Sequence, residues 1–153
     1  MTSITPFIQE VGYEQMDAQH RTMGSCMMEL ARRAAAADVT GTAAALEALW
    51  DETVTHFALE EDLMVTQGYP ERDAHRAAHQ LFLEHLRELM RLLTDEGVSE
   101  EAAVRAQHQV PDWFTFHVET NDAPLARFLV RKAASRMVSN ALGEPGPEVR
   151  SDA

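Results

Sequence analysis

The stretch from His56 to His79, HFALEEDLMVTQGYPERDAHRAAH, decides the fold of this chain. It contains a histidine and a glutamate four residues apart, His56 and Glu60, and then two histidines at the same spacing, His75 and His79. Residues four apart lie on nearly the same face of an α-helix. The Gly-Tyr-Pro sequence between the pairs breaks a helix. The stretch therefore predicts two helices, joined by a short turn, that direct three imidazoles and one carboxylate towards each other.

The rest of the chain has the same helical periodicity. Apolar residues recur every three to four positions, and no stretch alternates as a strand does. Asp17 is the expected N-cap of the first helix, and Thr40 or Thr42 that of the second. Pro111 should kink or restart the last helix, because proline lacks a backbone N–H. We expect helices over residues 17–37, 42–67, 71–93 and from 99 onward, with a further helical segment over 125–142.

These elements predict an all-α protein. The expected architecture is an antiparallel up-down-up-down four-helix bundle with an N-terminal arm and a short C-terminal helix. Residues 1–142 are long enough to form a single domain with its own core. The tail over residues 143–153, GEPGPEVRSDA, is expected to be disordered.

Composition limits the classes of partner. The 25 acidic and 13 basic residues give a formal net charge of -12, which disfavours nucleic acid and anionic membranes because both attract basic surfaces. The chain has a single cysteine, Cys26, so it cannot form an intrachain disulfide. Without a signal-peptide pattern or a long apolar run, we expect a cytoplasmic protein.

Five of the seven histidines fall on the core-facing sides of their predicted helices, where a polar group without a partner is costly. A single histidine on an apolar face is more often a hydrogen-bonded core residue than a metal ligand. Five together weaken that alternative. His85 and His108 lie off these faces and are expected at the surface. The candidate metal ligands are His20, His56, Glu60, His75, His79, His117 and Asp122.

Such a set is rich in nitrogen. It suits iron, zinc, copper or manganese better than calcium or magnesium, which prefer oxygen ligands. Seven protein ligands are too many for one tetrahedral zinc ion. Two metal ions bridged by the carboxylates would use all seven.

The same residues resemble the hemerythrin and bacteriohemerythrin family from about Val11 to Asp122. Each part of the resemblance is weak alone, but all parts occur in order and at compatible distances. The parts are Asp17-Ala-Gln-His20, His56-Phe-Ala-Leu-Glu60-Glu61, Tyr69-Pro70, His75-x3-His79 and Trp113-x3-His117-x4-Asp122.

The resemblance implies a role for each ligand. One iron would be held by His75, His79 and His117. The second would be held by His20 and His56, which leaves it an open position for dioxygen. The resemblance further implies that Glu60 and Asp122 bridge both irons, alongside an oxo or hydroxo group.

The surroundings of the open iron are expected to decide its chemistry. His117 and Asp122 are five residues apart and do not share one α-helical face, so we expect the helix to loosen near residues 121–122. On a helical wheel Phe114 and Val118 fall between these two ligands and predict an apolar wall beside the open iron. Glu119 lies outside that arc, where the family often has an aliphatic residue. It is either a solvated rim carboxylate or a proton donor to the oxygen pocket.

Three functions follow as hypotheses. The leading one is reversible binding of dioxygen at a non-haem diiron site, for storage, delivery or sensing. On this hypothesis the protein is a non-enzymatic oxygen-binding protein. The second is a diiron oxidase or peroxidase assisted by Glu119. The third is iron buffering, or sensing of nitric oxide or redox state through a partner protein. The fold does not decide among them, because function depends on the site.

Overall fold

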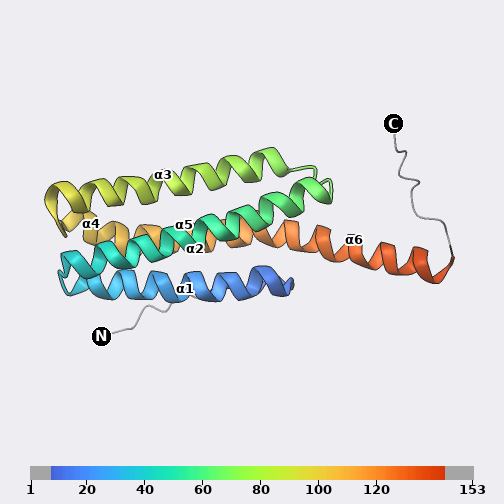
Figure 1. Cartoon of the computed structure of the whole chain (residues 1–153), viewed down its shortest axis with the longest axis horizontal. Helices are drawn as coiled ribbons and strands as arrows, with labels where there is room; N and C mark the ends of the chain where they lie inside the picture. The colour runs from blue at the N-terminus through green and yellow to red at the C-terminus, as the bar shows by residue number, and fades with distance from the viewer. Residues whose placement is uncertain (1–7, 144–153) are drawn as a thin grey trace.

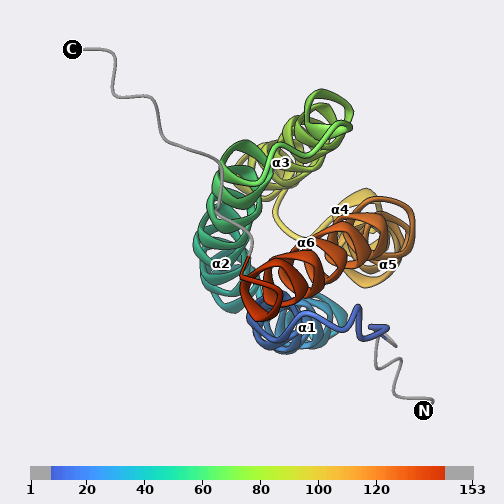
Figure 2. The same ribbon diagram turned by 90° about the vertical axis from the view of Figure 1, so that its right-hand side faces the viewer.

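The computed structural model describes residues 8–143, which form an antiparallel four-helix bundle without any strand in that range. Helix α1 (Glu14–Ala35) pairs with α2 (Val39–Thr66), and α3 (Arg72–Glu96) follows α2 back along the bundle (Figure 1). The fourth side is one long helical run, seen end-on beside α1 in Figure 2. This run comprises α4 (Glu100–Val104), η1 (Arg105–Gln109), α5 (Val110–His117), η2 (Val118–Asp122) and α6 (Ala123–Ala141). The predicted all-α bundle is confirmed.

The expected N-caps of the first two helices are wrong. Helix α1 begins at Glu14, so Asp17 lies within its first turn. The Asp17 carboxylate instead accepts hydrogen bonds from the backbone N–H groups of Val11 and Gly12, at 2.8 and 3.1 Å. It thereby fixes the segment that leads into the helix. For α2 the N-cap is Asp38, whose side chain accepts from the Gly41 N–H.

The turn between α2 and α3 lies where Gly-Tyr-Pro predicts it. Helix α2 ends at Thr66 and α3 begins at Arg72. Gly68 has a φ of 68°, a conformation that glycine adopts without the strain a side chain would cause. Ser99 caps the fourth helical run, since its hydroxyl accepts from the Ala102 N–H at 3.2 Å. The third loop is shorter than expected, because α3 continues to Glu96.

The fourth helical run continues through Pro111, and the α-helix restarts there as predicted, at the beginning of α5. Pro111 follows the π-helical segment η1, which has wider turns than an α-helix. A wider turn accommodates the missing N–H and the bulk of the proline ring. The expected loosening near residues 121–122 takes the same form. The chain stays helical there, but η2 is π-helical.

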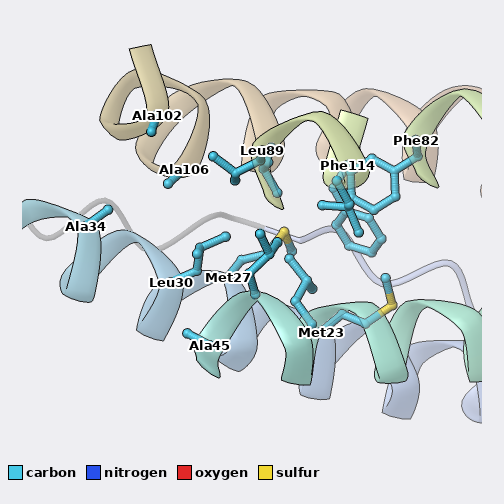
Figure 3. Packing of buried hydrophobic residues seen from close by; sticks show 14 of the residues in the cluster. Met23, Met27, Leu30, Ala34, Ala45, Phe82, Leu89, Ala102, Ala106 and Phe114 are labelled. Carbon is cyan, nitrogen blue, oxygen red and sulfur yellow. The ribbon is translucent and has the colours of Figure 1, made fainter. Parts of the chain in front are cut away.

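Two apolar clusters occupy the interior. The larger includes Met23, Met27, Leu30, Phe82 and Phe114, which meet from three sides of the bundle in Figure 3. The smaller cluster lies nearer the turn between α2 and α3. Its buried members are Met16, Met64, Tyr69, Leu125, Ala126 and Leu129. In α1, α2 and the fourth helical run, the candidate ligands lie between residues of the two clusters, whereas α3 contains members of the larger cluster alone.

The C-terminal helix covers nearly the predicted range but is not a separate element. Helix α6 continues η2 without a break, and its second half projects beyond the other helices (orange to red in Figure 1). Residues 143–153 are predicted to be disordered. Apart from Gly143, these residues lie outside the described part of the chain. Residues 1–7, which belong to the predicted N-terminal arm, also lie outside the described part of the chain. None of the helices in the described range is long and apolar enough to cross a membrane.

Candidate metal centre

Seven polar side chains meet in the interior of the bundle, and all seven are at most 2% exposed. Helix α1 contributes one, α2 and α3 two each, and the α5–η2 run two. Each helix therefore presents at least one of them to the same central point. The seven side chains are His20, His56, Glu60, His75, His79, His117 and Asp122, the set predicted from the sequence.

Glu60 divides its two oxygens between two sets of histidines. Its Oε1 lies 3.0 Å from Nε2 of His56. Its Oε2 lies 3.1 Å from Nε2 of His75 and 2.9 Å from Nε2 of His79. The carboxylate thus stands between one histidine of α2 and two of α3.

Asp122 makes the same division from the opposite side. Its Oδ2 lies 2.9 Å from Nε2 of His20 and 3.8 Å from Nε2 of His56. Its Oδ1 lies 3.0 Å from Nε2 of both His75 and His117. All five histidines therefore direct the same ring nitrogen, Nε2, towards the two carboxylates.

These side chains form two groups that share both carboxylates. In each group, one candidate ligand atom per residue lies within 4.8 Å of all the others. The first group has three histidines, His75, His79 and His117, and the second has two, His20 and His56. Each group also contains Glu60 and Asp122, so the carboxylates belong to both candidate metal positions.

Hydrogen bonding accounts for only part of this convergence. Both oxygens of Asp122, Oε1 of Glu60 and the Nε2 atoms of His75 and His117 have no hydrogen-bond partner in the described structure. Several of these atoms are nevertheless only 3.0 Å apart, so they are close without being aligned for a bond. Buried polar atoms without partners are costly and rare. Cations placed between them would satisfy them.

The charges of the site favour positive charge at its centre. Burial disfavours an ionised side chain, but Glu60 and Asp122 overcome that effect and raise the pKa of His56 to about 10 and that of His75 to about 9. Despite their burial, neighbouring imidazoles hold the pKa values of Glu60 and Asp122 well below the ordinary range. For His79 burial dominates and lowers the pKa. Metal cations could replace the protons on His56 and His75.

Comparison with known proteins assigns the family. The family model described as Hemerythrin HHE cation binding domain matches residues 11–129, which include all seven side chains. The chain belongs to the hemerythrin family. No solved structure gives a significant match.

The chain is also similar to proteins named bacteriohemerythrin and myohemerythrin. A bacteriohemerythrin of Pseudomonas aeruginosa is 28% identical, over 84% of this chain and 82% of the relative. A bacteriohemerythrin of Stenotrophomonas maltophilia is 26% identical, over 76% of this chain and 74% of the relative. A myohemerythrin of Theromyzon tessulatum is 24% identical, over 74% of this chain and 82% of the relative.

In this hemerythrin-family chain, hydrogen bonds orient two of the imidazoles from outside. The other ring nitrogen of His56, Nδ1, lies 2.7 Å from Oε1 of Gln19. Nδ1 of His79 lies 3.2 Å from Oε1 of Glu61. Such partners fix the ring so that Nε2 faces the metal position. The sequence alone did not lead us to predict a role for Gln19, although it lies directly before the candidate ligand His20.

Aromatic rings fix other imidazoles by packing. Phe57 stacks on His79 with centroids 3.7 Å apart and planes 10° apart. Trp113 stacks on His117 at 4.9 Å, also at 10°. Phe82 stacks on Trp113 as well, with ring centroids 4.2 Å apart. The tryptophan of the family motif therefore supports a candidate ligand.

The three residues predicted for the oxygen pocket separate in the structure. Phe114 and Val118 are buried, and the Phe114 ring lies edge-on to His20 at 5.5 Å. Glu119 is exposed and belongs to neither candidate group. Its position is that of the solvated rim carboxylate, the first of the two alternatives considered for it. His85 and His108 are exposed, as expected.

Proposed function

We propose that this protein binds two iron ions and, through them, binds dioxygen reversibly for storage, delivery or sensing. His75, His79 and His117 would hold one iron, and His20 and His56 the other. Glu60 and Asp122 would bridge the two, together with an oxo or hydroxo group. The proposal rests on family membership and on the chemistry of the seven buried side chains.

A single observation supports the proposal most strongly. Each carboxylate directs one oxygen to the His20 and His56 side and the other oxygen to the His75, His79 and His117 side. A carboxylate that served one metal ion would not need this division. Imidazole and carboxylate together suit iron, and a pair of irons held by these residues would supply the electrons for reversible dioxygen binding.

The two positions differ in a way that favours binding of a small molecule at one of them. The group with His20 and His56 has one protein ligand fewer than the group with three histidines. Buried Phe114 lies beside His20 of this position, and an apolar environment restricts access of water and protons. Exclusion of protons favours release of dioxygen unchanged.

Iron reconstitution tests the proposal. The protein, loaded anaerobically with ferrous iron, is expected to contain two irons per chain by elemental analysis. Its visible spectrum should change on exposure to air and revert when oxygen is removed. A protein that takes up iron but never shows an oxygen-dependent, reversible spectrum would contradict oxygen binding while leaving the metal site intact.

A matched pair of variants separates the site from histidine content alone. His117→Ala removes a buried candidate ligand, whereas His85→Ala removes an exposed histidine. We expect the first to lose iron and the spectral response, and the second to retain both. Equal loss in the two variants would contradict the assigned ligands.

Peroxide turnover assisted by Glu119 receives no support from the exposed position of that residue. Its test is peroxide-dependent oxidation of a dye by the wild type and by Glu119→Leu. We expect no difference between the two proteins. A marked loss of activity in Glu119→Leu would restore the oxidase or peroxidase hypothesis.

A further inference from the structure

The second half of α6 extends beyond the ends of the other helices. Residues 130–142, here called the arm, project past the ends of the other helices (Figure 1). Almost all of its side chains are exposed, and Met137 and Leu142 are 72% and 70% exposed. Large apolar side chains at such exposure are a reason to look for a binding partner.

The arm rests on its own bundle through its polar side. Lys132 Nζ donates to the backbone oxygen of Gln67 at 2.7 Å, and the Arg136 guanidinium donates to the Gln67 side chain at 2.9 Å. Gln67 is the C-cap of α2, where a cation is also favoured by the helix dipole. These bonds determine which side of the arm faces inward.

The apolar side consequently faces outward. Val130, Ala134, Met137 and Ala141 lie within about 60° of one another around the helix, and about 150° from the side that contacts Gln67. An apolar stripe that packed within a single chain would face the bundle instead. From Ala134 onward, this stripe faces away from it.

We propose that the outward stripe binds the same stripe of a second copy, with the two arms antiparallel. The spacing of its four residues is four, three and four, as at the core positions of a coiled coil. A twofold axis at the middle of the stripe places Val130 opposite Ala141 of the other copy, and Ala134 opposite Met137. Every layer then joins a large side chain to a small one, so the two arms interdigitate.

The base of the arm offers a place for the tip of the partner. A hollow of about 360 Å³ is lined by Val11, Gly12, Arg127, Val130 and Arg131. In the antiparallel arrangement the second copy brings its exposed Leu142 to this level of the arm. The apolar contact would therefore extend beyond the four-residue stripe.

Charge also favours a second copy of this chain. Residues 123–143 contain four basic residues and no acidic ones, so all 25 acidic residues lie elsewhere in the chain. Exposed Glu14, Glu71 and Asp73, together with exposed Arg72, lie at the starts of α1 and α3, which is the end of the bundle from which the arm projects. Each basic arm would approach this acidic end of its partner. An anionic membrane would attract the arm but repel the rest of the protein.

The expected dimer is weak. The arm is about 20 Å long, and two such helices bury less than a standard stable interface. Sedimentation velocity of the full chain should therefore show a monomer at low micromolar concentration and a dimer at several hundred micromolar. A wild-type monomer throughout this range would overturn the proposal.

Two charge substitutions locate the interface. Met137→Glu is expected to weaken the dimer at least tenfold, whereas Ser135→Glu adds the same charge off the stripe and should leave it unchanged. Both positions are exposed, so the fold and iron content should be retained in both variants. Equal dimerisation of Met137→Glu and wild type would contradict the assigned surface.

A mixing experiment tests the antiparallel register. Ala134→Glu alone and Met137→Lys alone should each be monomeric, and their equimolar mixture should recover dimer, because the two new charges then face each other. A parallel pair would not bring them together, so failure of the mixture to recover dimer contradicts the register. Binding of a monomeric wild type to phosphatidylserine vesicles would assign the stripe to a membrane and overturn the proposal.

Discussion

The Nε2 atom of His117 lies 3.0 Å from Oδ1 of Asp122, although the two residues are five positions apart on one helix. In an α-helix five residues turn the chain about 140° beyond a full turn, so the two side chains would diverge. The intervening segment, η2, is π-helical and has wider turns. The extra width brings both side chains to the same side.

Insertion of one alanine after Thr120 tests the spacing that this π-helical segment accommodates. The added residue places Asp122 one position farther along the helix and rotates it by about 100° relative to His117. We expect bound iron, measured by elemental analysis, to fall by half or more. Thr120→Ala keeps the helix length at the same exposed position and should retain its iron. Full iron content in the insertion variant would show that the direction of Asp122 is dispensable.

The metal-free protein should lose stability as the pH rises. The folded-state pKa values of His56 and His75 are raised from 6.5 to about 10 and about 9. Groups with raised pKa values stabilise the fold fully below their unfolded pKa, and this stabilisation disappears as the pH passes the folded values. We expect the thermal midpoint to fall by at least about 4 °C from pH 6.5 to pH 10, because each kcal/mol shifts it by about 2–4 °C in a chain of this size.

Iron supplies the control for this pH dependence. In the loaded protein the metal takes the place of the two protons, so the fall over the same range should be much smaller. Differential scanning calorimetry of both forms measures the difference. Parallel curves for the two forms would contradict the assignment of the pH effect to the site.

Gln19→Leu should weaken metal binding without removing a ligand. The side chain holds Nδ1 of His56, and loss of such an outer partner typically costs 10–100-fold in affinity, so a fall of about that size is expected. Competition with a ferrous chelator measures it. Gln15→Leu is the matched control, because Gln15 is exposed on the same helix and should retain wild-type affinity.

Asp17→Ala should destabilise the fold by about 1–3 kcal/mol, because it removes a buried carboxylate that accepts two backbone hydrogen bonds. Urea unfolding measures the change. Glu14→Ala removes a carboxylate from the same turn, but one that is exposed and paired only with exposed arginine, so its effect should be below about 1 kcal/mol. Similar losses in the two variants would contradict the role given to the Asp17 bonds.

Periodicity was sufficient to predict the bundle and the convergence of most of the candidate site. His56 with Glu60, and His75 with His79, need only the four-residue repeat of an α-helix to face one point. His20 and His117 follow from their places on apolar stripes. These positions are local properties of regular helices, which a sequence records directly.

Features that depend on irregular geometry were less accessible. The π-helical turns have no simple sequence signature, so the position of Asp122 could be predicted only as a loosening of the helix. Asp17 has the composition of an N-cap, but its carboxylate reaches back to the preceding segment instead. Periodicity alone does not say which side of a helix faces inward. The outward direction of the α6 stripe follows from the hydrogen bonds of Lys132 and Arg136 to Gln67, which the sequence does not predict.

The fourth helical run is continuous from Glu100 to Ala141, so a tilt at the metal centre would also move the arm. The tip of the arm lies about 28 Å along the helix from Asp122, at 1.5 Å per residue. A tilt of about 5° at Asp122 would move the tip by about 2.5 Å, enough to change which side chains meet across a twofold axis. Occupancy of the metal centre and association of the arms would then influence each other equally, as thermodynamic linkage requires.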